Sequence, residues 1–189
     1  MRRTRPLPLT HPEFSVIDSP NFREYKIENW HLARDGSQKV VKGAHGLTWT
    51  SATILALLSL AWRKGSESPW TLAGLILLLG YLVWSKCTQV LFESVVVVAP
   101  HGIQLETHRG FPPSTVLSVS RCFIPAASLD DFVINEGLRR WSVRYYLVAI
   151  QKMGSDEHVL QVAYENILPH FPVLLEVYRG VQKTFFSHQ

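Results

Sequence analysis

Two apolar stretches dominate the pattern of hydrophobic and polar positions along the chain. They run from Ala44 to Trp62 and from Pro69 to Ser85, and the polar run 63–68 separates them. As helices with a rise of about 1.5 Å per residue, each would be roughly 25–28 Å long, which is the low end of what crosses a bilayer. Aromatic residues near their ends suit the lipid–water boundary. The pattern therefore predicts a two-helix transmembrane hairpin over residues 44–85. The competing interpretation is a pair of buried core helices.

After residue 86 the pattern changes to one that is typical of β-strands. Runs of β-branched or alternating residues, bounded by turn formers, predict a series of strands. They cover Phe92–Val98, Ile103–His108, Thr115–Ile124, Asp131–Ile134, Ser142–Ile150 and His158–Val162. Alternation in the second strand places Gln104, Glu106 and His108 on one polar face. Strands at this spacing, joined by short turns, indicate an antiparallel sheet that curls into a small barrel or sandwich.

An amphipathic helix is predicted at the C-terminal end of the chain. Leu174, Val177, Tyr178, Val181 and Phe185 recur at helical spacing, and polar residues lie opposite them. Such a stripe favours packing against the same domain, with partner binding as the alternative. A curled sheet closed by a helix resembles the pleckstrin-homology-like architecture, a likeness of shape that does not confer lipid binding. The predicted fold class is an α+β membrane protein, with a two-helix transmembrane hairpin followed by this small antiparallel sheet and helix.

The pattern divides the chain into three parts. Residues 1–43 form a basic N-terminal segment, residues 44–85 the hairpin, and residues 86–189 the β-rich domain with its helix. The basic, proline-rich residues 1–11 favour disorder, and the mixed composition of Phe14–Val41 predicts no definite element. Basic residues next to the first apolar stretch, without a short cleavable signal before it, favour a cytosolic location for both termini and for the β-rich domain.

Composition and charge narrow the classes of function. The chain is 47% hydrophobic, which suits a membrane hairpin combined with a domain in water. Its net charge is +4, of which +3 lies before position 44, and the residues from Lys86 onward are neutral, which argues against nucleic acid as the main partner. Cys87 and Cys122 are too few for a disulfide framework or a thiolate metal site. No nucleophile elbow, phosphate-binding loop or zinc-protease motif is present. The sequence therefore predicts no catalytic residue, no metal site and no cofactor.

One cluster of exposed residue types stands out between Asn135 and Arg144. Arg139, Arg140 and Arg144 surround Trp141 on a predicted strand hairpin. Guanidinium and indole groups together can sit at a membrane surface or anchor a protein interface. An ordinary solvated turn with a half-buried tryptophan is an equally good interpretation.

Four short runs carry a resemblance to a known family. They are Ser19–Tyr25 (SPNFREY), Asp131–Gly137 (DFVINEG), Val143–Leu147 (VRYYL) and Leu174–Arg179 (LLEVYR). In these runs and in their order, the chain resembles the PIG-H family, which is the H component of the phosphatidylinositol N-acetylglucosaminyltransferase complex. The resemblance extends from about Ser19 to Lys183.

The resemblance implies a non-catalytic, membrane-anchored scaffold. The complex transfers N-acetylglucosamine from UDP-GlcNAc to phosphatidylinositol on the cytosolic face of the endoplasmic reticulum, the first step of GPI-anchor biosynthesis. The implied partners are the catalytic A component, the other subunits and the endoplasmic reticulum membrane, with phosphatidylinositol as a further candidate. The alternative is a stand-alone, membrane-anchored lipid-sensing domain.

The candidate contact residues fall into two groups. Those for a partner or lipid are Asn135, Glu136, Arg139, Arg140, Trp141, Arg144, Tyr145 and Tyr146. Those for docking through the N-terminal segment are Pro20, Arg23, Glu24 and Tyr25.

Overall fold

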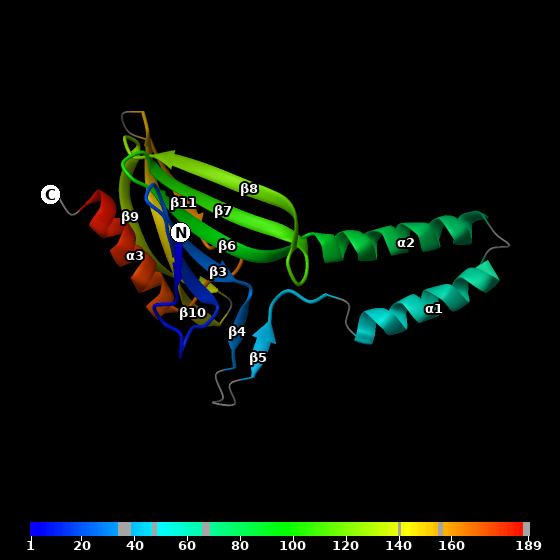
Figure 1. Ribbon diagram of the computed structural model, residues 1–189. Coiled ribbons are helices and arrows are strands. Elements are labelled where there is room, and N and C mark those ends of the chain that lie inside the picture. Colours follow the sequence, from blue (N-terminus) through cyan, green and yellow to red (C-terminus); the bar gives the residue numbers. More distant parts are fainter. Residues whose placement is uncertain (34–38, 47–48, 66–68, 140, 155–156, 187–189) are drawn as a thin grey trace.

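Two antiparallel sheets and one helix form the body of the protein (Figure 1). The structure is a computed structural model that describes residues 1–33, 39–46, 49–65, 69–139, 141–154 and 157–186. The larger sheet has the order β1-β2-β3-β6-β7-β8 and the smaller has the order β11-β10-β9. A short pair, β4 and β5, lies apart from both.

The larger sheet comprises β1 (Arg2–Thr4), β2 (Phe14–Asp18), β3 (Arg23–Glu28), β6 (Gln89–Val98), β7 (Gly102–Phe111) and β8 (Thr115–Pro125). The smaller comprises β9 (Leu129–Arg139), β10 (Ser142–Met153) and β11 (Glu157–Ala163). The remaining elements are β4 (Trp30–Leu32), β5 (Val40–Lys42), α1 (Trp49–Gly65), α2 (Pro69–Cys87) and α3 (Phe171–Phe185).

Each strand predicted after residue 86 is confirmed, and each is longer than the pattern indicated. Gln104, Glu106 and His108 do share a face of β7, but they are half-buried because they bond to one another. The Glu106 carboxylate accepts hydrogen bonds from Gln104 and, at 3.0 Å, from Arg121 Nε, and its other oxygen lies 2.8 Å from His108 Nε2. Burial opposes ionisation of Glu106, but the hydrogen bonds from His108 and Gln104 outweigh it and lower the pKa of the carboxyl.

The N-terminal residues supply three strands of the larger sheet, β1 to β3, that the sequence pattern did not predict. β3 pairs with β6 in an antiparallel register from Arg23 with Val97 to Glu28 with Phe92. β2 pairs with β3, and β1 pairs with β2. β1 lies within residues 1–11, whose composition favoured disorder, so that prediction does not hold for β1. These strands are three to six residues long, so they offer few alternations for a pattern to detect.

The prediction of a two-helix transmembrane hairpin is wrong. Among the described helices, only α2 is long and apolar enough to cross a membrane, with 19 residues and a mean hydropathy of 1.5. The first helix begins at Trp49 rather than Ala44, and its apolar part ends at Trp62. At about 1.5 Å per residue, that part is roughly 21 Å long against a hydrocarbon core of about 30 Å. The described residues are mostly β-sheet, and they include three helices.

Residues 44–46 are held against the body instead of extending α1. Lys86 Nζ donates to the carbonyl oxygens of His45 at 3.3 Å and Gly46 at 3.2 Å, and Gln89 Oε1 accepts from the His45 amide at 2.7 Å. The alternative of two buried core helices does not hold for α2, because none of its residues is buried. Figure 1 shows α1 and α2 projecting together away from the sheets.

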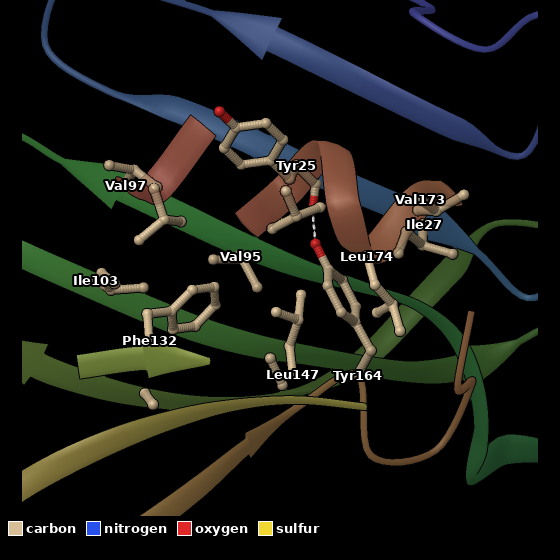
Figure 2. Packing of buried hydrophobic residues seen from close by; sticks show 14 of the residues in the cluster. Tyr25, Ile27, Val95, Val97, Ile103, Phe132, Leu147, Tyr164, Val173 and Leu174 are labelled. Atoms are coloured by element: carbon tan, nitrogen blue, oxygen red, sulfur yellow. Dashed lines mark hydrogen bonds between the residues drawn. The ribbon is translucent and has the colours of Figure 1, made fainter. Parts of the chain in front are cut away.

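The core lies between the two sheets and α3 (Figure 2). Val173, Leu174, Val177 and Val181 on α3 are fully buried, so the predicted packing of this helix on its own domain is confirmed. α3 approaches β3 closely at Gly180, where an added Cβ would overlap the Tyr25 hydroxyl.

A buried hydrogen bond joins the end of β11 to the larger sheet. Tyr164 Oη donates to the Tyr25 carbonyl oxygen at 2.8 Å (Figure 2), and Tyr164 is 4% exposed. Burial raises the pKa of the Tyr164 hydroxyl well above its ordinary value, so the group stays protonated and keeps donating.

Replacing Tyr164 by phenylalanine tests this bond. Tyr164→Phe removes the hydroxyl that donates to the Tyr25 carbonyl oxygen, and we expect the free energy of unfolding to fall by about 1–2 kcal/mol at pH 7. The raised pKa means that the folded state holds the proton more tightly than the unfolded state. The contribution of the Tyr164 hydroxyl to stability is therefore complete below pH 10.0, the ordinary pKa of tyrosine, and declines as the pH rises above that value.

Urea unfolding between pH 7 and about 11 measures both effects. The variant should lose part of the alkaline destabilisation seen in the parent chain. Tyr145→Phe, which changes an exposed tyrosine of β10, is the matched control. Equal unfolding curves for the two variants would contradict the structural role of the Tyr164 hydroxyl.

Candidate functional site

A cavity of about 750 Å³ lies where β4, the start of β10 and the loop before α3 meet. We call it the His170 cavity. Its lining consists of Glu13, Ile27, Asn29, Trp30, His31, Gly43, Trp141, Ser142, Arg144, Ile167, Leu168, Pro169 and His170.

The His170 cavity brings the end of the β9–β10 hairpin beside the segment that precedes the helices. Trp141 and Arg144 come from the turn end of the β9–β10 hairpin, and Trp30 comes from the segment before the helices. Trp141 is 102% exposed, so its indole is fully presented to solvent. A solvated indole beside a guanidinium is the kind of group that anchors a protein interface when a partner covers it.

Histidines and a buried carboxylate form another part of the lining of this cavity or lie directly beside it. His11 Nδ1 lies 3.1 Å from Glu13 Oε1, and the ring of His170 lies 5.4 Å from that of His11 and 6.3 Å from that of His31. Glu13 is 5% exposed, and its second oxygen has no hydrogen-bond partner within the described part of the chain. No group of three or more potential metal ligands is found among the described residues. Sequence reasoning missed these residues because they are distant along the chain and match no motif.

The other residues predicted for the β9–β10 hairpin lie elsewhere. Asn135, Glu136 and Tyr145 line a second hollow of about 480 Å³ on the side facing α3, where the rings of Tyr145 and Phe171 are 5.0 Å apart. Alternation along β10 separates Tyr145 from Arg144, which lines the His170 cavity.

The remaining residues of this group are Tyr146, Arg139 and Arg140. Tyr146 packs beside Gly137, where an added Cβ would lie 3.0 Å from its ring. Arg139 is the last residue of β9, and Arg140 lies outside the described residues.

The candidate N-terminal docking residues line neither hollow. Pro20 is exposed in the turn between β2 and β3, Arg23 is exposed and paired with Asp18, and Glu24 is half-buried. Tyr25 is 2% exposed and its ring lies 6.5 Å from that of Phe14, so it is a core residue and not an available contact.

A buried glutamate positions the loop that completes the His170 cavity. Glu93 on β6 is 2% exposed, and its oxygens accept from Asn166 Nδ2 at 2.7 Å and from the Ile167 amide at 3.0 Å. The loop is a tight turn, because Tyr164 and Leu168 have φ of 58° and 48°, values that are uncommon for residues other than glycine. Residues 167–170 of this loop line the His170 cavity, whereas Glu93 does not. Glu93 therefore holds this part of the cavity wall in place without lining the cavity.

The part of the chain that is similar to known proteins includes the β9–β10 hairpin, which carries the exposed Trp141. Residues 94–165 match the family model described as "GPI-GlcNAc transferase complex, PIG-H component". The resemblance to the PIG-H family is confirmed. The match extends from Ser94 on β6 to just past β11, so it includes Trp141 and Arg144 but not the β4 wall of the His170 cavity.

Relatives named as subunits of the same complex show similarity over about half of their length. The chain is 34% identical over 88 residues to the gpi15 subunit of phosphatidylinositol N-acetylglucosaminyltransferase from Schizosaccharomyces pombe, covering 46% of this chain and 50% of that protein. It is 31% identical over 115 residues to the H subunit of the human phosphatidylinositol N-acetylglucosaminyltransferase, covering 59% and 56%. The chain thus spans about half the length of the curated relatives it matches. No solved structure matches the chain.

Replacing Glu93 by glutamine tests the support of the cavity wall. Glu93→Gln replaces one acceptor oxygen by an NH2 group, which cannot accept a hydrogen bond from the N–H donors of the loop. We therefore expect the free energy of unfolding to fall by about 2–3 kcal/mol. Amide hydrogen exchange at residues 166–170 should also become faster. Glu165→Gln, an exposed change beside the same loop, is the control. Equal exchange in both variants would show that Glu93 does not hold the loop.

Proposed function

We propose that this chain is a non-catalytic, membrane-anchored subunit of the complex that transfers N-acetylglucosamine from UDP-GlcNAc to phosphatidylinositol. The match of residues 94–165 to the PIG-H component is the observation that carries the proposal. Relatives in fission yeast and human are named as subunits of phosphatidylinositol N-acetylglucosaminyltransferase, which supports a role in the first step of GPI-anchor biosynthesis.

In this proposal the His170 cavity is the docking surface for the catalytic subunit. Its exposed Trp141 and half-buried Arg144 are residue types that dominate binding energy in interfaces. Aromatic rings from Trp30, His31 and His170 surround them, which suits the insertion of a partner side chain. The hollow lined by Asn135, Glu136 and Tyr145 is a second contact surface for the other subunits.

The membrane anchor in this proposal is α2, inserted in the endoplasmic reticulum membrane with the sheets in the cytosol. Its apolar residues are unburied, and it leads directly into β6. Because β3 pairs with β6, the chain before α1 and the chain after α2 lie on the same side of that membrane, so in this proposal α2 enters the bilayer from that side without crossing it. Anchoring the sheets there would hold a docked transferase beside its lipid acceptor, which raises the effective concentration of the reactants.

Removing the two cavity side chains tests the docking surface. With Trp141→Ala/Arg144→Gln we expect recovery of the catalytic subunit with the tagged full chain to fall at least about tenfold, because truncated hot-spot residues each cost more than 1 kcal/mol. The measurement is quantitative co-purification from detergent-solubilised membranes. Leu160→Ala/Lys152→Gln is the control, since both residues are exposed on β10 and β11. Unchanged recovery with the cavity variant would exclude this surface.

The loss of the chain tests the assignment itself. Microsomes from cells that lack it should fail to make N-acetylglucosaminyl-phosphatidylinositol from radiolabelled UDP-GlcNAc, and re-expression of the chain should restore the product. Normal synthesis without the chain would contradict the proposed role in the complex. It would favour the alternative of a stand-alone lipid-sensing domain.

A further inference from the structure

A second large cavity lies at the base of the projecting helices. It has a volume of about 790 Å³, within the range of about 300–1,000 Å³ that is usual for small-molecule sites. Its walls come from β3, β4, the end of β5, residues 44–46 and the turn 112–114. We call it the basic pocket, because Lys26 and Lys42 both line it.

The basic pocket has an excess of positive charge. Lys26 Nζ lies 3.6 Å from the centre of the Phe92 ring, and Lys42 is exposed. Neither lysine forms an ion pair with another described residue. Among the described residues that line the pocket, Glu28 is the one carboxylate. It is already engaged by Arg3 Nη2 at 3.2 Å and by Trp30 Nε1 at 2.8 Å. The two ammonium groups are thus available to an anion.

An apolar slot adjoins this pocket. The slot has a volume of about 200 Å³ and lies between α1 and α2, with walls that include Ile54, Leu55, Leu82 and Val83. Lys86 lines the slot and donates to the carbonyl oxygens of His45 and Gly46, which line the pocket. Phe111 of the slot is also followed directly by Pro112 of the pocket. The two hollows are therefore neighbours, one charged and one apolar.

The slot and the basic pocket lie at different heights along α2, as the acyl chains and the head groups of a bilayer do. α2 is apolar and unburied up to Lys86, and the sheet begins at Gln89. With α2 in a membrane, the slot lies beside the acyl chains and the basic pocket at the level of the head groups. Trp30 in the pocket wall is a residue type that favours that boundary.

We propose that the basic pocket and the slot together bind one anionic glycerophospholipid of the surrounding bilayer. Its phosphate lies between the ammonium groups of Lys26 and Lys42, and one acyl chain enters the slot between α1 and α2. The charge of the pocket selects for a net negative head group, and the slot selects for a lipid over a soluble phosphate. The bound lipid joins the projecting helices to the sheets.

Lipid selectivity of the full chain tests the site. The chain is reconstituted in phosphatidylcholine nanodiscs that contain about 20% phosphatidylserine, an anionic lipid that attracts basic segments, with spin-labelled phosphatidylserine or spin-labelled phosphatidylcholine as tracer. Electron paramagnetic resonance measures the immobilised fraction of each. We expect about a fivefold preference for phosphatidylserine, the factor that corresponds to the attraction of one basic residue at a membrane surface. Lys26→Gln/Lys42→Gln should remove it. Lys152→Gln/Lys183→Gln, on β10 and α3, should retain it.

Other outcomes would overturn the proposal. Equal immobilisation of the two lipids by the parent chain would show that no anionic site exists. An equal loss in both double variants would show a diffuse attraction in place of a site. Displacement of the spin-labelled lipid by millimolar inorganic phosphate would identify a site for a soluble anion. Leu82→Trp fills the slot without changing charge, and it should lower the immobilised fraction of phosphatidylserine; no change would exclude the slot.

This inference rests on the membrane anchoring proposed above, but not on the docking of the transferase. Failure of the co-purification test leaves the lipid selectivity unaffected. Absence of the selectivity, in nanodiscs that retain the chain, leaves both the anchoring and the assignment to the complex in place.

Discussion

Six residue pairs between β3 and β6, from Arg23 with Val97 to Glu28 with Phe92, join the chain before the helices to the chain after them. Everything between these strands must therefore leave the sheet and return to it. Because their two ends are held at neighbouring strands, α1 and α2 project from the sheet as a helical hairpin. The pairing also brings β4 and β5 beside the start of β6. Both large cavities lie along this junction, because the segment before the helices lines one wall of each.

Buried polar groups then fix how the second sheet and α3 close on the first. Tyr164 reaches the backbone of β3, and Glu93 on β6 holds the loop that follows Tyr164. A buried donor or acceptor costs more when it is left without a partner than it contributes when paired, so such bonds select one arrangement among several of similar apolar packing. These bonds therefore determine where Ile167 and His170 lie in the wall of the His170 cavity.

The two cavities differ in the partner that their chemistry suits. The His170 cavity presents an exposed indole, a guanidinium and histidine rings, which are groups that recognise protein side chains. The basic pocket presents two ammonium groups beside an apolar slot at the base of an unburied helix. A protein that contacts a partner enzyme with one side and a lipid with the other would be well suited to bring an enzyme to a membrane substrate.

The strands after residue 86 and the amphipathic helix α3 could be predicted from the amino-acid pattern alone, because their alternation and helical spacing are local and extend over enough residues. Short runs such as those around Asn135 and Tyr146 also indicated the resemblance to the PIG-H family. Only the tertiary structure decided that β1 to β3 belong to the sheet, because short strands depend on a neighbour for their hydrogen bonds. It also decided that Tyr25 is a core residue, that α1 is too short to span a bilayer, and that Trp30, Trp141 and His170 share one cavity. These features depend on contacts between residues far apart in the chain, which no local pattern records.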